Sequence, residues 1–180
     1  RNGSYDFMNY FKRNIVINHD FNIKQKEIYD NIISCYHKKK SVSCFIYGNM
    51  NVGKTMLAYI LAKKIGGSIC DVFNPTEPSD SIDHMYSRIH PTPECPLVLL
   101  LDEIDILLTA IHNKNVVHNS RYPVSVYNKT TWNKMLDKID YGLYPNLLLI
   151  MCSNKTYKEI QELDSSYLRQ GRVDLIEHLG

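Results

Sequence analysis

The sequence has no closely spaced pair of cysteines and no long apolar run. Each absence argues against a class of protein. The five cysteines stand at positions 35, 44, 70, 95 and 152, and no two of them form a C-x-x-C pair. Scattered cysteines in an odd number argue against a zinc site or a disulfide frame, and they indicate reduced thiols in an intracellular protein. No apolar run reaches the roughly 20 residues that a helix needs to cross a bilayer. We therefore expect no membrane span in this segment.

An excess of charge of either sign is also missing. The net charge is +2, so no broad electrostatic field favours nucleic acid or an anionic membrane. One basic run, His37 to Lys40, ends a predicted helix, where cations complement the helix dipole. A nucleic-acid contact is the alternative for this run. The ordinary apolar and charged fractions predict one globular domain with a core of its own.

The stretch from Gly48 to Thr55 fits the pattern G-x-x-x-x-G-K-[ST], which is typical of a phosphate-binding P-loop. Backbone N–H groups of such a loop form a nest for phosphate oxygens, and the next helix points its positive end at the same anion. Lys54 would reach the β- and γ-phosphates of a nucleotide, and the Thr55 hydroxyl would hold Mg²⁺. Asn51 stands where many such loops have Gly, and Asn tolerates a positive φ. The residues expected to bind the nucleotide are Gly48, Asn49, Met50, Asn51, Val52, Gly53, Lys54, Thr55 and Met56.

The residues on either side of this loop support the P-loop prediction. An apolar strand, Val42 to Tyr47, precedes it and a helical run, Met56 to Ile65, follows it. A chance match is the alternative, which residue usage predicts in about one such chain in a hundred.

A second apolar run, Leu97 to Leu101, ends in carboxylates. A run of this length fits a central parallel strand that is buried on both faces, and ligands bind at the carboxyl ends of such strands. Asp102 would contact Mg²⁺, and Glu103 would polarise the attacking water. A strand followed by an acidic helix cap is the alternative.

Two further polar elements lie next to predicted strands, one after a strand and one before a strand. Asn154 ends a buried strand over 146–153, where it can bind a water or the γ-phosphate without adding charge; an ordinary turn residue is the alternative. Arg169 and Arg172 flank Gly171 before a last strand over 173–179. They are candidates for arginine fingers, which stabilise the charge on a transferring phosphoryl group. A salt-bridged surface is the alternative.

The rest of the chain alternates between strand and helix patterns. We expect a strand over 68–73 and helices over 22–36, from Ser79 or Asp80 to Ile89, over 106–111 and over 131–139, with Trp132 in the core. This alternation predicts a parallel sheet with helices on both faces. Ile15 to Ile17 are candidates to line the base pocket, with ordinary packing as the alternative.

These elements together resemble the large ATPase domain of the AAA family. Gly48 to Thr55 matches Walker A, Leu99 to Asp105 matches Walker B, and Asn154 matches the sensor asparagine. Asp164 to Asp174 matches the stretch D-x-A-L-x-R-P-G-R-[FV]-D of the second region of homology, and its ending is most similar to the subfamily of the mitochondrial Rieske-protein translocase.

The resemblance implies an α/β fold, the P-loop NTPase three-layer sandwich, with a five-stranded parallel sheet in the order 5-1-4-3-2. It implies a homo-oligomeric ring, usually a hexamer, in which Arg169 and Arg172 serve the ATP of the neighbouring subunit. It also implies that residues 1–180 are the large domain, with an N-terminal extension over about 1–21 and a small helical lid after Gly180.

Three departures from the family pattern bear on function. Asn51 replaces the loop Gly and Gln170 replaces a Pro, and both replacements are expected to be tolerated. No aromatic–apolar–Gly triplet follows the second strand, around Phe73 to Ser81, so threading of a protein through a pore is unsupported. We therefore expect a Mg-ATP hydrolase that remodels or translocates a protein. The alternatives are a nucleic-acid motor or loader, a nucleotide-gated scaffold and a small-molecule kinase.

Overall fold

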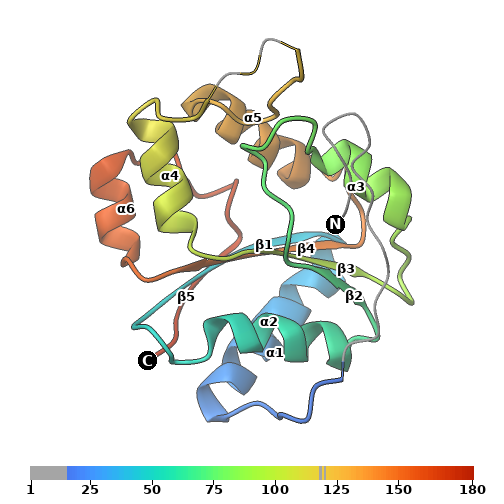
Figure 1. The fold of residues 1–180 in the computed structure, drawn as a ribbon. Coiled ribbons are helices and arrows are strands. Elements are labelled where there is room, and N and C mark those ends of the chain that lie inside the picture. Colours follow the sequence, from blue (N-terminus) through green and yellow to red (C-terminus); the bar gives the residue numbers. More distant parts are fainter. Residues whose placement is uncertain (1–15, 118, 120) are drawn as a thin grey trace.

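Five parallel strands form the centre of the molecule, and helices cover both faces of the sheet (Figure 1). The computed structural model describes residues 16–180 except 118 and 120. The elements in chain order are α1 Ile23–Lys39, β1 Val42–Tyr47, α2 Lys54–Lys64, β2 Ser68–Cys70, α3 Ile82–Ile89, β3 Leu97–Leu101, α4 Ile104–His112, α5 Lys129–Asp140, β4 Leu147–Ser153, α6 Tyr157–Leu163 and β5 Leu175–His178.

The strand order is β2-β3-β4-β1-β5, and every neighbouring pair is parallel. This confirms the predicted order 5-1-4-3-2. All residues of β3 and β4 are buried, as expected for central strands that helices cover on both sides. The long apolar runs in the sequence are therefore the middle of the sheet.

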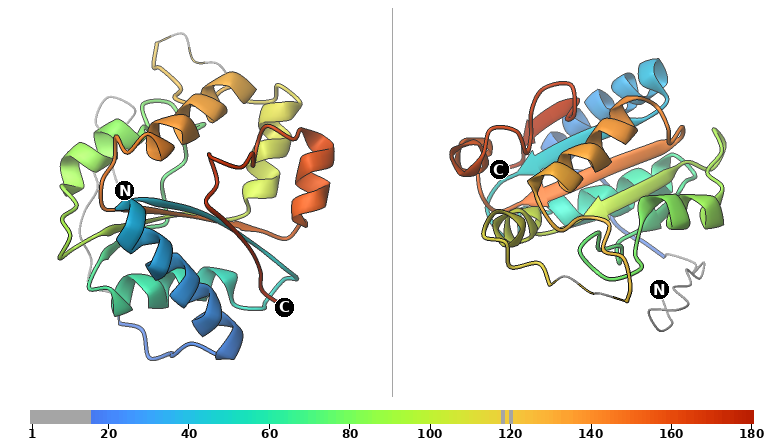
Figure 2. Two further views of the ribbon diagram at one scale, coloured as in Figure 1. Left: turned by 180° about the vertical axis from the view of Figure 1, so that it is seen from behind. Right: turned by 90° about the horizontal axis from the view of Figure 1, so that it is seen from above.

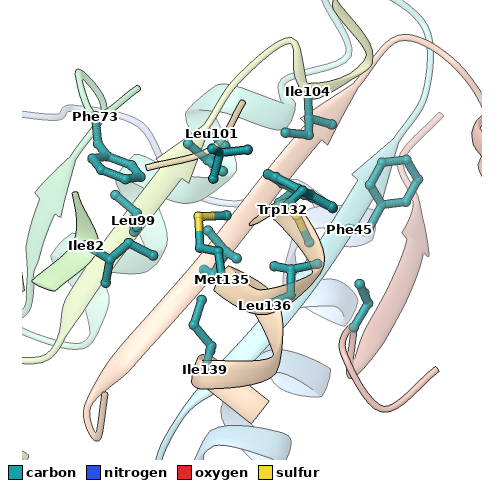
Figure 3. Packing of buried hydrophobic residues seen from close by; sticks show 14 of the residues in the cluster. Phe45, Phe73, Ile82, Leu99, Leu101, Ile104, Trp132, Met135, Leu136 and Ile139 are labelled. Atoms are coloured by element: carbon teal, nitrogen blue, oxygen red, sulfur yellow. The ribbon is translucent and has the colours of Figure 1, made fainter. Parts of the chain in front are cut away.

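The sheet divides the core into two layers, one on each of its faces. α1 and α2 lie below the sheet in Figure 1, and α3, α4, α5 and α6 lie above it. Seen from above, α5 lies over the strands (Figure 2). Figure 3 shows Trp132, Met135, Leu136 and Ile139 of α5 close to side chains of the sheet. Trp132 is fully buried, which confirms its predicted place in the core.

Some boundaries differ from those that the sequence predicts. β2 ends at Cys70, three residues earlier than predicted, because only Ser68 to Cys70 pair with β3. The cap of α3 is Ser81, whose hydroxyl accepts a hydrogen bond from the His84 N–H. The predicted caps were wrong: Ser79 has a φ of 62°, and Asp80 instead accepts a hydrogen bond from the Asn74 N–H.

The sequence analysis missed one helix, α6. Its cap is Thr156, which exchanges hydrogen bonds with Glu159 in a capping box. The pattern T-x-x-E is a known signal for a helix start, so the sequence did contain the information. Within the described residues, no helix is long and apolar enough to cross a membrane.

Candidate active site

Three loops meet at the carboxyl edge of the sheet, because β4 lies between β1 and β3. Tyr47 at the end of β1 pairs with Ser153, and Leu101 at the end of β3 pairs with Met151. The P-loop, the acidic pair after β3 and Asn154 after β4 therefore begin close together. Ligands bind at this edge in open α/β sheets.

The P-loop backbone takes conformations that suit Gly and Asn. Asn51 has a φ of 64°, as its tolerance for a positive φ allows, and Gly53 has a φ of 94°. A Cβ atom on Gly48 would lie 1.9 Å from the carbonyl oxygen of Leu179, so only glycine fits there. The backbone N–H groups of residues 49–56 find no acceptor among the described residues. They are left to bind water or an anion.

Lys54 anchors the base of this loop. Its side chain is buried, and its ammonium donates hydrogen bonds to the carbonyl oxygens of Gly48 and Asn49, each at 2.8 Å. The third hydrogen bond goes to Oδ1 of Asn154, at 2.9 Å. All three acceptors are neutral. Charged phosphate oxygens make stronger hydrogen bonds and can replace one of them.

Thr55 and Asp102 come together across the two loops. The Thr55 hydroxyl donates a hydrogen bond to Oδ2 of Asp102 at 2.7 Å, and the Glu103 N–H donates to Oδ1 at 3.0 Å. Glu103 itself is exposed and has a φ of 50°, a left-handed conformation that costs a non-glycine residue about 1–3 kcal/mol. Such strain occurs at functional sites, where the surrounding structure maintains it.

The sequence analysis gave no role to two residues that support the site. Asp105, in the first turn of α4, is buried and accepts a hydrogen bond from the Asn154 N–H at 3.3 Å. Gln25, in the first turn of α1, is buried and donates to the carbonyl oxygen of Gly53 at 3.0 Å. Asp105 is part of the predicted acidic stretch, and Gln25 forms a capping box with Asn22, but their long-range partners have no signal in the sequence.

The two arginines differ in their surroundings. Arg172 donates to both carboxylate oxygens of Asp137 on α5, at 2.5 and 3.2 Å, and its side chain is 12% exposed. Arg169 is exposed, and its guanidinium makes no hydrogen bond or ion pair with the described part of the chain. The segment that carries both residues enters the sheet at the start of β1, where the Asp174 N–H donates to the Ser43 carbonyl oxygen at 2.9 Å. That end of β1 is opposite the P-loop.

The candidate base-pocket segment is only partly described. Ile15 lies outside the described residues, and Val16 is exposed. Ile17 is buried, and its carbonyl oxygen accepts a hydrogen bond from Lys63 in the last turn of α2. Lys63 follows Lys54 by nine residues, about 13 Å of helix, so Ile17 fits the packing alternative better than the base pocket.

Two neutral side chains, those of Cys152 and Tyr59, lie close enough to Asp102 for its charge to raise their pKa values. Burial raises the pKa of the Cys152 thiol on β4, and the charge of Asp102 raises it further. Burial and a hydrogen bond to Asp71 raise the pKa of Tyr59 on α2 to about 12. Both groups therefore stay protonated at neutral pH and do not compete with Asp102 for a cation.

The chemistry of these groups fits Mg-ATP. The unpaired N–H groups of the loop and the Lys54 ammonium suit phosphate oxygens. The Thr55 hydroxyl and the Asp102 carboxylate are hard oxygen ligands, and Mg²⁺ is usually bound by one or two such groups together with water and phosphate.

Comparisons with known proteins bear on the fold and the family of the chain. One similar solved structure is that of PCH-2 from C. elegans, with a TM-score of 0.50 and 16% sequence identity. The match covers 87% of this chain and 42% of that chain, so the sequence spans less than half of PCH-2 and the likeness concerns the fold alone. The comparison with curated proteins gave no match. The model of the ATPase family associated with various cellular activities (AAA) matches residues 44–180. Since this match covers most of the sequence, the chain belongs to the AAA family of ATPases.

Proposed function

We propose that this chain hydrolyses Mg-ATP in a ring of identical subunits, and that hydrolysis drives the remodelling or translocation of a protein partner. One observation carries the catalytic part of the proposal. Lys54, Asp102 and Asn154, which lie far apart in the sequence, are joined at one edge of the sheet by two hydrogen-bonded links, Lys54 with Asn154 and Thr55 with Asp102.

Each residue of the edge has a distinct role. Lys54 and the loop N–H groups bind the triphosphate, and Thr55 and Asp102 hold Mg²⁺. When bound there, the metal would supply positive charge that offsets the charge of the phosphate groups. Glu103 accepts a proton from the attacking water, and Asn154 positions that water. The exposed side chain of Glu103 leaves its carboxylate free for this role.

The remaining group, an arginine, comes from a neighbouring subunit. The arginine segment lies at the Ser43 end of β1, and Gly48 follows Ser43 by five residues, about 16 Å of strand. Arg169 therefore lies at the end of the sheet opposite its own P-loop. We infer that Arg169 of one subunit completes the ATP site of the next, as the predicted ring requires.

The contacts of the basic run at the end of α1 favour a protein partner over nucleic acid. Lys39 donates hydrogen bonds to Asp140 at 3.0 Å and to Asp174 at 2.5 Å, so its charge is used within the chain. This leaves the run with less capacity for phosphate contacts. Stimulation of turnover by a protein partner, with none by DNA or RNA at about 50 mM salt, is the expected result. Nucleic-acid stimulation that falls steeply with salt would favour the motor or loader instead.

The substitution Glu103→Gln tests the hydrolase directly. It keeps the shape of the side chain and removes the base, so turnover falls by about 10²–10⁴-fold while the Kd for ATP changes by less than about twofold. Glu94→Gln, in the exposed loop before β3, is the matched control and keeps full turnover. Full turnover in the Glu103 variant would remove this residue from the mechanism.

A further inference from the structure

Helix α5 holds the arginine segment, residues 164–172, along most of its length. One face of α5 packs on the sheet, and the contacts to the segment come from Trp132 on that face and from side chains at helical spacing beside it. The four contacts are Lys129 Nζ to Asp164 at 2.8 Å, Asn133 to the Ser166 hydroxyl at 3.2 Å, Trp132 Nε1 to the Tyr167 carbonyl oxygen at 3.1 Å, and Arg172 Nε to Asp137 at 2.5 Å.

Every nitrogen of the Arg172 guanidinium group donates a hydrogen bond within the chain. Nε and Nη2 donate to the two carboxylate oxygens of Asp137, and Nη1 donates to the carbonyl oxygen of Ser166 at 3.2 Å. Two parallel hydrogen bonds of this kind fix both the distance and the orientation of the pair. The pair is largely shielded from water, with the two side chains 12% and 25% exposed. Arg172 would have to leave all three of these acceptor atoms, on Asp137 and Ser166, to reach a neighbouring subunit.

Arg169 lies three residues away, on the same turn. Its carbonyl oxygen accepts hydrogen bonds from the N–H groups of Arg172 and Val173, at 3.0 and 3.2 Å, and Gly171 completes the turn with a φ of 97°. The backbone of Arg169 is therefore fixed by the residue that Asp137 holds, while its side chain projects into solvent.

We propose that the two arginines have different roles: Arg169 alone contacts the neighbouring nucleotide, and Arg172 with Asp137 is a positioning pair that fixes the Arg169 turn on α5. This inference rests on the proposed function for the role of Arg169. It departs from the assignment of both arginines to the neighbouring site. Asp137, on a helix that contributes nothing to its own ATP site, becomes a determinant of turnover in the next subunit.

The substitution Asp137→Asn separates the two assignments in the assembled full-length protein. If the pair positions Arg169, Asp137→Asn and Arg172→Gln each lower kcat by about 10–100-fold, with KM for ATP within about twofold of wild type, since misplacement by about 1 Å can cost 10²-fold. The double variant then falls no further, because both changes remove one interaction. If Arg172 itself contacts phosphate, Asp137→Asn frees it and turnover stays the same or rises. That result, or full turnover in Arg172→Gln, would overturn the proposal.

Asp140→Asn is the matched control, because Asp140 lies on the same helix and is also ion-paired, with Lys39. We expect it to keep turnover within about twofold of wild type. If the polar variants do not fold, the apolar pair Asp137→Leu/Arg172→Met decides, since replacing a buried ion pair by packed apolar side chains is often neutral for stability. Turnover within about tenfold of wild type in that variant supports positioning. Loss of about 10³-fold with ATP still bound shows a phosphate contact.

Hydrogen exchange gives a readout that does not depend on ATPase activity. The Tyr167 N–H donates to the Asp164 carbonyl oxygen, and the N–H groups of Arg172 and Val173 donate to that of Arg169. Asp137→Asn should accelerate their exchange by at least about tenfold, and Asp140→Asn should not. Wild-type protein without turnover would contradict the proposed function, whereas unchanged exchange in Asp137→Asn would contradict the positioning pair.

Discussion

At the scale of single residues, the hydrogen bonds of Lys54 lead to the clearest prediction. Its buried ammonium is already held in place by three neutral oxygens, so little side-chain order is lost when phosphate replaces one of them. We predict that Lys54→Met weakens ATP binding by about 10–100-fold, which corresponds to the 1.5–3 kcal/mol of a hydrogen bond to a charged group. Isothermal calorimetry measures this. Lys63→Met, on the same helix with an exposed side chain, should bind ATP as wild type does. Equal affinities in both variants would count against the P-loop assignment.

Asp105 leads to a second prediction at this scale. Its buried carboxylate accepts a hydrogen bond from the Asn154 N–H and so fixes the loop that presents the Asn154 side chain to Lys54. Asp105→Asn should lower kcat by about 10-fold and leave KM for ATP within about twofold, because the residue acts on the position of Asn154 and not on the nucleotide. Asp83→Asn, an exposed aspartate on α3, is the control. A raised KM with unchanged kcat would place Asp105 in nucleotide binding instead.

At the scale of elements, most of the fold could be predicted because its signals are local. β3 and β4 are continuous apolar runs, and the P-loop has a fixed spacing between Gly48 and Lys54. The missed α6 has seven residues, too few for a helical period to show. The length of β2 was predicted wrongly because it depends on how many residues pair with β3, and the sequence of β2 alone does not show this.

The supporting contacts could not be predicted, because they join residues far apart in the chain. Asp137 and Arg172 are separated by 35 residues, and Asp105 and Asn154 by 49. The motifs locate the groups that we propose to bind a nucleotide, whereas only the fold shows which contacts hold those groups in place. For Arg172, the contact with Asp137 changes the role that we assign to the residue.

The contact between Lys129 and Asp164 predicts a pH dependence for the junction of α5 with the arginine segment. The hydrogen bond from Lys129 lowers the pKa of the Asp164 carboxyl from 3.8 to about 2. A carboxyl whose pKa is lower in the folded state stabilises the fold above its unfolded pKa, and this contribution is lost as the pH falls from about 4 to 2. Since Lys129 is half exposed, we expect about 1 kcal/mol or less.

Urea unfolding of wild type and Asp164→Asn between pH 6 and 2.5 measures this contribution. The difference in unfolding free energy should be constant above pH 5 and shrink below pH 4. In a Lys129→Met background the shrinkage should be smaller, because the pKa of Asp164 returns toward its usual value. A difference that stays constant down to pH 2.5 would show that Asp164 gains nothing from its charge.

At the scale of the whole molecule, the important feature is that the proposed ATP site and the arginine segment lie at opposite ends of β1. The segment after β2 bears on the kind of partner. It packs on residues 122–126 of the same chain. The Ser79 N–H donates to the Pro123 carbonyl oxygen at 2.8 Å, and the Val126 N–H donates to that of Pro75 at 2.9 Å. With no aromatic–apolar–Gly triplet in it, this segment gives no support to threading. Remodelling of a folded or assembled partner is the form of the proposed function that fits it better.

A site completed by a neighbour makes turnover depend on assembly. We predict that ATP turnover per subunit of the full-length protein rises with protein concentration, and that Arg169→Gln lowers it by about 10³-fold at every concentration, the lower range for an arginine finger. Mixing Arg169→Gln with Lys54→Met subunits should restore part of the activity, because an intact P-loop can then meet an intact Arg169 across an interface. Turnover that is independent of concentration and is not restored by mixing would mean that each subunit completes its own site, which the distance along β1 between the arginine segment and the P-loop argues against.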